Sequence, residues 1–422
     1  MGPTGRRGIS LPALAAALQL IVGVAGASEP EPLRVATSGD YAPFSELPRP
    51  KAALFDVRGL DPAIIRAYAT ERRIQIEWVQ FRWPELVNDL RAGRFDIAIG
   101  GITVRPERSV AGRYSLPTAS SGAVVLLPRA SPERELAELD RRGVRIAVNA
   151  GGHLERVTRA RFRFAEIIAV PDNAAVPNML MEREVHAIVS DTLEAPHWNA
   201  DARGWRVLGP FTHDRKAFLL APERAALAKD LDTWLLRRER DATLAGLRTE
   251  YLGRASESRP AEPLQALVAS VEERLALMPF VAAIKQRRGL PIEVPERETQ
   301  VLDAAVAAVR SAAKSAGDDV APSEAAVRRL FRAQIEAAKV VQRRVLVAPP
   351  PPTTPVFDLD TELRPALLRI GERIAWLLPR LPATLDPAEV RAASELALAA
   401  SRLDPAHVSA IASAIAALRP AQ

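Results

Sequence analysis

The feature that most constrains the fold is a change in residue pattern near residue 255. Before it, short β-type runs alternate with helical segments, whereas the sequence after it is Ala-rich, has helical periodicity and contains no strand signal. The segment between them, RASESRPAEP, combines Ser, Pro and charge, which is typical of a linker. A length of 422 residues allows two to three domains. The sequence therefore predicts an α/β domain over residues 28–255, a linker over 256–263 and an all-helical domain over 264–422.

The N-terminus has the pattern of an export signal. Arg6 and Arg7 precede a mostly apolar run over 9–24, and the AGA at 25–27 has the small-x-small pattern of a cleavage site. The run is short and leads into a polar, Pro-rich segment, which favours a signal peptide over residues 1–27 rather than an uncleaved anchor. We therefore expect a periplasmic or secreted protein without a membrane segment after signal removal, exported by the general or the twin-arginine route.

Composition excludes several classes of function. The formal net charge is +6, but the 57 basic residues are spread among 51 acidic ones and form no run interleaved with aromatics. This pattern argues against nucleic-acid binding and suits small acidic substrates. The chain has no Cys, which excludes disulfides and thiol catalysis, and its five His lack the spacing of a metal site. No metal or organic cofactor is implied, and a homo-oligomer is compatible with the sequence.

The first domain alternates strand and helix. Strand patterns recur at 33–37, 74–79, 95–100, 123–127, 144–148, 167–170 and 187–190. This alternation implies parallel sheets with helices on both faces, and ligands in such folds lie at the carboxyl ends of the strands. We expect two lobes, the first from about 33–120 and 210–252 and the second from 121–209, which close over a ligand.

Characteristic segments follow the predicted strands at those ends. They are SGDYAPF (38–44), GGITVRPERS (100–109), NAGGHLE (149–155) and DTLEA (191–195). This set resembles the periplasmic solute-binding proteins of the polar-amino-acid type. Together with RWPELVNDL (82–90) and VPDN (170–173) it is similar to cyclohexadienyl dehydratase, a solute-binding fold turned into a catalyst. The resemblance covers about residues 33–252.

The resemblance implies roles for five residues. Thr103 and Arg108 should hold a substrate carboxylate, which suits the bidentate geometry of a guanidinium. Glu194 matches the general acid, Asn149 a polar contact to the substrate, and Trp83 should line the cleft. Dehydration of prephenate or arogenate needs a proton on the departing hydroxyl while the ring carboxylate leaves as carbon dioxide. A carboxyl held neutral in a closed cleft would supply that proton.

One position departs from the dehydratase pattern. The family carries a Lys in the crossover segment, and here Ala123 stands at that place in SLPTASSGAVVL (115–126). Either another residue supplies the cation, or the first domain binds a solute without catalysis, which the fold permits.

The second domain reads as a series of helices. Helical periodicity covers about 264–286 with a kink at Pro279, then 296–316, a helix capped by Ser323, and three more at 361–378, 387–401 and 405–418. A proline segment at 349–355 reads as a spacer. Lys285 follows Arg274 by eleven residues, so at about 100° per residue both cations share one face of the first helix. Among apolar neighbours, such cations predict an anionic ligand.

This domain resembles the secreted all-helical chorismate mutases of the gamma subclass. The carrying segments are MPFVAAIK (278–285), LPIE (290–293), RE (297–298), QIEAAKVVQ (334–342) and LRPALLRIGERI (363–374). The resemblance covers about residues 262–380. The last helices match least, and we expect them to serve packing.

The resemblance implies a dianion site. Chorismate rearranges to prephenate by a pericyclic step that needs cations on two carboxylates and a donor on the ether oxygen. The implied roles are carboxylate binding by Arg274 and Arg373, contact with the ether oxygen by Lys285 and Gln342, ordering of the carboxylate side by Arg297, and acceptance of the substrate hydroxyl by Glu298.

The two resemblances name consecutive reactions. The sequence therefore predicts a two-lobed α/β periplasmic-binding-protein-like domain followed by an all-α chorismate mutase domain, acting together on the route from chorismate through prephenate to phenylalanine. Two alternatives stay open: an active mutase fused to a non-catalytic solute-binding module, and a purely structural helical module.

Overall fold

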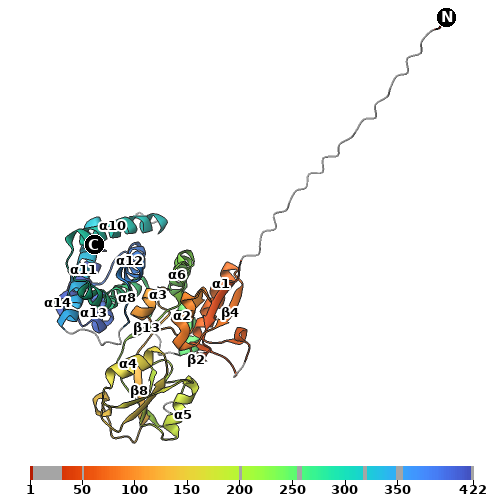
Figure 1. Cartoon of the computed structure of the whole chain (residues 1–422), viewed down its shortest axis with the longest axis vertical. Helices are drawn as coiled ribbons and strands as arrows, with labels where there is room; N and C mark the ends of the chain where they lie inside the picture. Colours follow the sequence, from red (N-terminus) through yellow and green to blue (C-terminus); the bar gives the residue numbers. More distant parts are fainter. Residues whose placement is uncertain are drawn as a thin grey trace. The chain divides into compact units, whose positions relative to one another are not determined.

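The computed structural model (Figure 1) describes residues 1–2, 31–49, 52–198, 202–253, 259–316, 321–347 and 355–419. Residues Pro32–Gln422 form one compact unit. The predicted signal peptide lies outside the described residues beyond Met1 and Gly2, and so does the proline segment at 349–354. No helix in the described ranges is long and apolar enough to cross a bilayer.

Two five-stranded sheets form the α/β part of the chain. Their strand orders are β4-β1-β5-β14-β6 and β10-β9-β11-β8-β12. The first sheet contains β1 (Leu33–Thr37), β4 (Ile76–Gln80), β5 (Ile97–Ala98), β6 (Arg113–Tyr114) and β14 (Leu219–Leu220). The second contains β8 (Ala123–Pro128), β9 (Arg145–Asn149), β10 (Glu166–Val170), β11 (Ala187–Asp191) and β12 (Trp205–Leu208). Two short pairs join β2 (Asp40–Tyr41) to β3 (Ser45–Glu46) and β7 (Ala119–Ser121) to β13 (Asp214–Lys216).

Helices cover these sheets. They are α1 (Leu60–Arg72), α2 (Leu86–Arg91), α3 (Pro106–Ala111), α4 (His153–Arg161), α5 (Val176–Met181), α6 (Ala225–Arg240) and α7 (Thr243–Leu252). Strands β8 (AVVLLP) and β11 (AIVSD) are buried along almost their whole length, as expected for apolar runs in the middle of a covered sheet. Asn149 and Asp191 end β9 and β11, which pair in parallel, so both polar ends meet at one edge of the second sheet.

The prediction of purely parallel sheets is wrong in part. Strands β4, β1 and β5 are parallel, but β14 runs antiparallel to β5 and β6, and β8 runs antiparallel to β11 and β12. The reason is the connection between the lobes. Strand β8 enters the second sheet, and β14 returns to the first, from the paired crossover strands β7 and β13. Without a helical crossover, such strands have no need to run parallel.

The second domain is helical throughout its described residues. Its helices are α8 (Pro263–Ala276), α9 (Met278–Arg287), α10 (Pro295–Ala316), α11 (Glu324–Val347), α12 (Arg364–Leu377), α13 (Pro387–Leu398) and α14 (Pro405–Ala416), with a short helical turn, η5 (Leu359–Leu363), before α12. The expected kinked helix over 264–286 is instead two helices that break at Leu277. Pro279 is the cause, because its ring clashes with the carbonyl four residues back and it has no N–H to donate.

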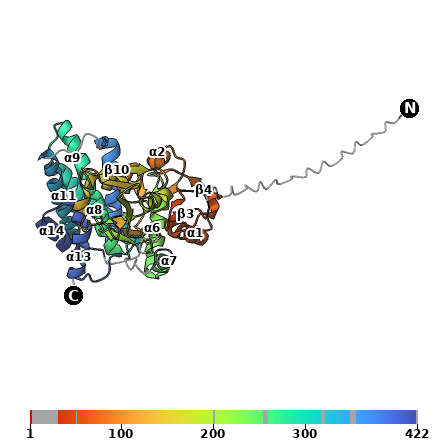
Figure 2. The ribbon, with the colours of Figure 1, turned by 90° about the horizontal axis from the view of Figure 1, so that it is seen from below.

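The caps predicted from the sequence are confirmed. The Ser323 hydroxyl accepts from the Ala326 amide at 3.2 Å, and the Asp386 and Asp404 carboxylates accept from the first turns of α13 and α14. Helix α13 packs on α8, and α14 packs on α11 and α13. Figure 2 shows α8, α9, α11, α13 and α14 gathered at one end of the folded unit.

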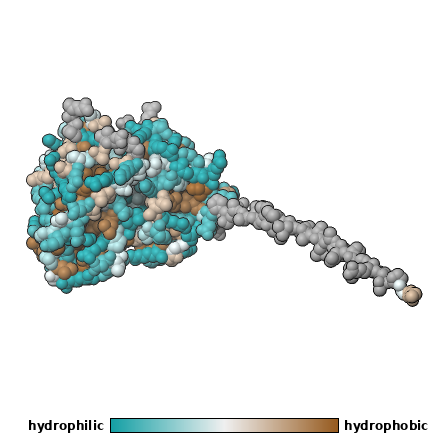
Figure 3. All heavy atoms as spheres, turned by 90° about the horizontal axis from the view of Figure 1, so that it is seen from above, coloured by the Kyte–Doolittle hydropathy of each residue, from teal (hydrophilic) through white to brown (hydrophobic). Residues whose placement is uncertain are grey.

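The two domains share packing. Helix α3 of the first domain contacts α8 and α12 of the second, and one buried apolar cluster runs from the first sheet into the helices. Hydrophilic side chains cover much of the face shown in Figure 3, with smaller hydrophobic patches among them. Helix α3 also carries Arg108, one of the residues predicted to bind substrate.

Candidate active sites

A buried arginine marks the first site. Arg108 lies in α3, two residues after Pro106 begins this helix, and only 4% of it is exposed. Its Nη1 donates to the Thr103 carbonyl oxygen at 3.0 Å, and its guanidinium lies 5.8 Å from the centroid of the Trp83 ring. Burial lowers the pKa of Arg108 to about 10, and no described carboxylate forms an ion pair with it. A buried guanidinium without such a partner is suited to a substrate carboxylate.

A second buried cation, Lys216, was missed in the sequence. It ends β13, and its Nζ donates to Thr103 Oγ1 at 3.0 Å and to Tyr41 Oη at 3.1 Å. The same Nζ lies 3.1 Å from Asp191 Oδ2. Asp191 is also the backbone partner of Ala123 across the β11–β8 ladder, so Lys216 reaches the neighbourhood of the position where a Lys was expected. The sequence signal was a lone Lys directly before the buried run AFLLA (217–221).

Glu194 is held as a neutral acid. It is 1% exposed, and its two carboxyl oxygens accept from Asn173 Nδ2 at 2.5 Å and from Ser190 Oγ at 2.7 Å. Burial, with the nearby negative charge of Asp191, raises the pKa of Glu194 to about 8. At neutral pH the protonated carboxyl therefore prevails, which is the state that a general acid needs.

Both lobes enclose this site. One cavity is lined from the first lobe by Tyr41, Trp83, Thr103 and Arg108, and from the second by Asn149, His153 and Asn173. Asn173 Nδ2 donates to the Asp40 carbonyl oxygen at 3.3 Å, and the Tyr41 hydroxyl donates to the Asp191 carboxylate, so hydrogen bonds join the lobes. Asn149 is 8% exposed, and its Nδ2 lies 3.4 Å from the Val170 carbonyl oxygen, a long contact that leaves the amide available to a ligand. We call this enclosed site the cleft.

An unmatched arginine marks the second site. Arg274 lies in the last turn of α8 and is partly buried. Its Nη1 lies 3.5 Å from the Leu367 carbonyl oxygen of α12. Burial lowers its pKa to about 10, and no described carboxylate pairs with it. The predicted cation without a counter-ion is therefore present, on the side of α8 that faces α12.

Lys285 and Gln342, also predicted for this site, lie on α9 and α11. Lys285 Nζ donates to the Ile292 carbonyl oxygen at 2.9 Å. Burial lowers its pKa, the Arg364 guanidinium lowers it further, and the Glu298 carboxylate opposes them. Gln342 is buried, its Nε2 makes only a 3.6 Å contact with Met278 Sδ, and its Oε1 has no partner among the described residues. An amide so poorly matched is free to bind a ligand.

Arg297 and Glu298, in the first turn of α10, differ in placement. Glu298 lies 3.0 Å from Lys339 Nζ and within electrostatic range of Lys285. Arg297 is exposed and donates to Gln300 Oε1 at 3.3 Å, and it makes no hydrogen bond or ion pair with Arg274 or Lys285.

The structure does not bring Arg373 to these cations. Arg373 donates to Ser270 Oγ and to the Tyr114 carbonyl oxygen, both at 3.0 Å, and pairs with Glu273 at the contact between the domains. Helix geometry explains the difference, because position 373 lies about 120° around α12 from Leu367, the residue that Arg274 touches. Arg364, three residues before Leu367, lies on the Arg274 side.

Arg364 is therefore the α12 cation of the second site. It perturbs the pKa of Lys285, and its only ion pair among the described residues is with Asp360 in the preceding turn. The segment LRPALLRIGERI contains both arginines, and only the phase of the helix separates them. We call the cations Arg274, Lys285 and Arg364, together with the neutral amide of Gln342, the helical cation group.

Substitution at the two arginines separates their roles. We expect Arg364→Ala to lower kcat/KM for chorismate by about 10- to 100-fold, because it removes a charge-assisted contact to the dianion. Arg373→Ala should instead lower the melting temperature, because it leaves buried Glu273 unpaired, while the folded fraction keeps its mutase rate. Mutase kinetics at a temperature where both variants are folded check this. A mutase defect confined to Arg373→Ala would show that the assignment is reversed.

Among the described residues, no three His, Asp or Glu side chains are grouped to hold a metal ion.

Two family models match this chain. Residues 33–254 match the model of the bacterial extracellular solute-binding proteins, family 3, which is more than half of the chain. The chain belongs to this family. In this family 3 chain, residues 265–343 also match chorismate mutase type II, which confirms the predicted combination of a two-lobed α/β domain with an all-helical mutase domain.

The chain is similar to curated relatives over its first half. Cyclohexadienyl dehydratase from Pseudomonas aeruginosa is 30% identical over 217 residues, which are 50% of this chain and 79% of the relative. The L-arginine-binding protein of the same species is 26% identical over 193 residues, which are 44% of this chain and 73% of the relative. A solved structure of an ancestral amino acid-binding protein, a precursor of cyclohexadienyl dehydratase, is 26% identical with a TM-score of 0.48 and covers 52% of this chain and 95% of that one.

Proposed function

We propose that this chain catalyses two consecutive reactions, chorismate to prephenate in the helical domain and prephenate to phenylpyruvate in the cleft, with arogenate as an alternative cleft substrate that would give phenylalanine. The observation that carries the proposal is that Asn173, which lines the same cleft as Arg108, donates to the buried Glu194 carboxyl of raised pKa, in a chain that also matches the chorismate mutases. No cofactor is needed for either reaction.

The dehydration follows from the cleft residues. Arg108 and Thr103 hold a substrate carboxylate, and Lys216 adds a second positive charge beside Thr103. Glu194 donates its proton to the departing ring hydroxyl, which leaves as water. The ring carboxylate leaves as carbon dioxide, and its bonding electrons complete the aromatic ring. Closure of the lobes keeps solvent from the reacting atoms, and the Glu194 proton is replaced from water after opening.

The rearrangement needs no proton transfer. Arg274, Lys285 and Arg364 hold the two carboxylates of chorismate in the folded conformer, and the Gln342 amide donates to the ether oxygen as charge develops there. Glu298 accepts the substrate hydroxyl. Gln342 donates at any pH, whereas a carboxyl at that position would first need a proton.

The chain is proposed to act in the periplasm or outside the cell, since its family consists of extracellular solute-binding proteins and the N-terminus has a signal pattern. Cell fractionation with N-terminal sequencing of the mature protein tests this. Cleavage after residue 27 in an exported fraction is expected, and an uncleaved cytoplasmic protein would contradict it.

Each half of the proposal is tested with its own substrate. Purified protein given prephenate should form phenylpyruvate, and given chorismate should form prephenate. The rival function, a non-catalytic binding module on an active mutase, has Ala123 as its support. Binding of prephenate without turnover would favour that rival.

The position of Lys216 predicts that this residue supplies the positive charge that Ala123 does not. Lys216→Met should reduce phenylpyruvate formation by about 10- to 100-fold, because a buried charged contact is lost, while the mutase rate stays unchanged. Lys314→Met, an exposed lysine on α10, is the control. Adding Ala123→Lys to Lys216→Met should restore part of the rate, since both positions adjoin Asp191. Full dehydratase activity in Lys216→Met alone would refute this role.

The raised pKa of Glu194 predicts the pH profile of the cleft. The reaction needs the protonated acid, so kcat for prephenate should be steady below about pH 8 and fall as pH rises through the Glu194 pKa of about 8. Chorismate rearrangement should show no such fall between pH 7 and 9, which makes it the internal reference. A dehydratase rate that rises across this range would mean that Glu194 acts as a base.

A further inference from the structure

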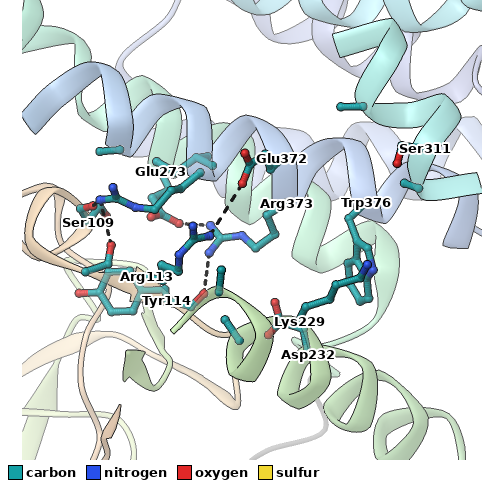
Figure 4. Close-up of a pocket in the computed structure, with 18 of the residues that line it drawn as sticks. Ser109, Arg113, Tyr114, Lys229, Asp232, Glu273, Ser311, Glu372, Arg373 and Trp376 are labelled. Atoms are coloured by element: carbon teal, nitrogen blue, oxygen red, sulfur yellow. Dashed lines mark hydrogen bonds and ion pairs between the residues drawn. The ribbon is translucent and has the colours of Figure 1, made fainter. Parts of the chain in front are cut away.

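A third cavity lies between the two domains, apart from both sites above. It has a volume of about 380 Å³, within the range of small-molecule pockets. Its walls come from α3 and α6 of the first domain and from α8, α10 and α12 of the second. Figure 4 shows Lys229 and Asp232 on one side, with Tyr114, Glu273 and Arg373 across from them. We call it the interdomain cavity.

The space exists because small side chains meet there. The apolar part of the wall consists of Ala225, Ala228, Ala308, Ala312, Ala366, Ile370 and Trp376. Five alanines from three helices leave room beside one large ring. Trp376 is 8% exposed, and its Nε1 has no hydrogen-bond partner among the described residues. A buried indole N–H is normally paired, so its lack of a partner here points to an occupant.

Asp232 and Lys229 face the cavity, and neither forms an ion pair with a described residue, while burial raises the pKa of Asp232 to about 7. Asp232 is 6% exposed, and its Oδ1 accepts from the Leu116 amide at 2.7 Å, while its Oδ2 accepts from none of the described residues. Lys229, one turn earlier on α6, is exposed at the rim and forms no ion pair with a described residue. The other charged lining residues are engaged: Arg373 pairs with Glu273, and Arg369 donates to three carbonyl oxygens of α3 and its end.

The charge balance selects the ligand class. Four cations (Arg113, Lys229, Arg369 and Arg373) and three carboxyls (Asp232, Glu273 and Glu372) line the cavity, so it is close to neutral. A dianion such as prephenate would find one free cation and one opposing carboxylate. A zwitterion would match both, with its ammonium on Asp232, its carboxylate on Lys229 and an apolar side chain against the alanines and Trp376.

We infer that the interdomain cavity binds an α-amino acid with an apolar or aromatic side chain. This site is separate from the cleft, and its occupancy does not depend on either proposed reaction. Its position connects it to both domains. Asp232 holds the amide of Leu116 at the start of the crossover to the second lobe, and Glu273 directly precedes Arg274 of the helical cation group.

Calorimetric titration of the full chain tests the inference. Because the cleft belongs to a family that binds solutes, the titration uses the Arg108→Ala protein, which lacks the cleft's carboxylate partner. Phenylalanine and leucine should bind. Glycine, phenylpropionate and phenethylamine, which lack the side chain, the ammonium and the carboxylate respectively, should each bind at least about tenfold more weakly.

Variants locate the binding. In the Arg108→Ala background, Asp232→Asn and Lys229→Met should each weaken phenylalanine binding by about tenfold or more, and Ala308→Leu should abolish it by filling the space. Asn at 232 keeps the acceptor for Leu116, and Lys229 is exposed, so both variants should fold. Lys314→Met, which lies outside the cavity, should bind as the parent does. Absence of amino-acid binding in the Arg108→Ala protein, equal binding of phenylpropionate, or binding indifferent to these substitutions overturns the inference.

Discussion

Glu194→Gln should reduce phenylpyruvate formation from prephenate by about 10²- to 10⁴-fold, the usual contribution of a general acid. The amide has the shape of the carboxyl and keeps an acceptor for Asn173, but it carries no acidic proton. The remaining activity should lose the fall near pH 8 that Glu194 imposes on the parent enzyme. Steady-state kinetics with prephenate, followed by phenylpyruvate absorbance, measure both effects.

This prediction has two controls, a second variant and the mutase activity of the same protein. Glu184→Gln changes an exposed carboxylate of the second lobe and should leave both activities as they are. The mutase rate of the Glu194→Gln protein should equal that of the parent, because Glu194 belongs to the cleft and not to the helical cation group. If Glu194→Gln keeps full dehydratase activity, another group is the acid. If both activities fall together, the substitution has damaged the fold.

Arg274→Ala should lower kcat/KM for chorismate by about 10²- to 10³-fold, the effect of removing one preorganised electrostatic group at a transition state. Arg274 has no carboxylate partner among the described residues, so its removal leaves no buried charge behind, and the fold should survive. Chorismate consumption at its absorbance maximum measures the loss, and prephenate turnover by the same preparation shows that the first domain is intact.

Arg287→Ala is the matched control for Arg274. It removes an exposed arginine at the end of α9, thirteen residues further along the chain, and should leave chorismate turnover unchanged. Unchanged turnover in Arg274→Ala and Lys285→Ala would support a purely structural helical module and exclude the proposed mutase site.

Much of the fold could be predicted from the sequence, because the local patterns of strands and helix caps were strong. The strand patterns, the Asp-Pro helix starts at 386 and 404, and the Ser323 cap all appear in the structure. Strand direction could be predicted less well from the sequence. It depends on the connection between the lobes, which is made by the crossover strands β7 and β13 and leaves no pattern in any single strand.

The site residues show the same division. Arg108 and Glu194 follow strands at the cleft edge, where chain order predicts them. Lys216 reaches the cleft from the returning crossover strand, a segment with little sequence pattern of its own. When a cation from a distant segment takes the place of another in a site, the sequence around the original position does not show it.

The sequence led to Arg373 instead of Arg364 as the α12 cation for a different reason. Arg364 and Arg373 lie nine residues apart in one helix and therefore on opposite faces of it, and the sequence alone does not show which face packs against Arg274 and which against the first domain. The break at Leu277 has the same effect on the argument that placed Arg274 and Lys285 on one face, since the two residues lie on separate helices. Arg274 contacts Leu367 of α12 and Lys285 lies within electrostatic range of Arg364 of α12, so α12 and not the period of one helix relates the two cations.

The most direct test of the whole account is a single progress curve with chorismate as the only substrate of the purified full-length chain. The proposed function predicts that chorismate is consumed, prephenate rises and falls, and phenylpyruvate accumulates with an equal amount of carbon dioxide. Prephenate that accumulates without phenylpyruvate would contradict the account, and so would chorismate that is not consumed.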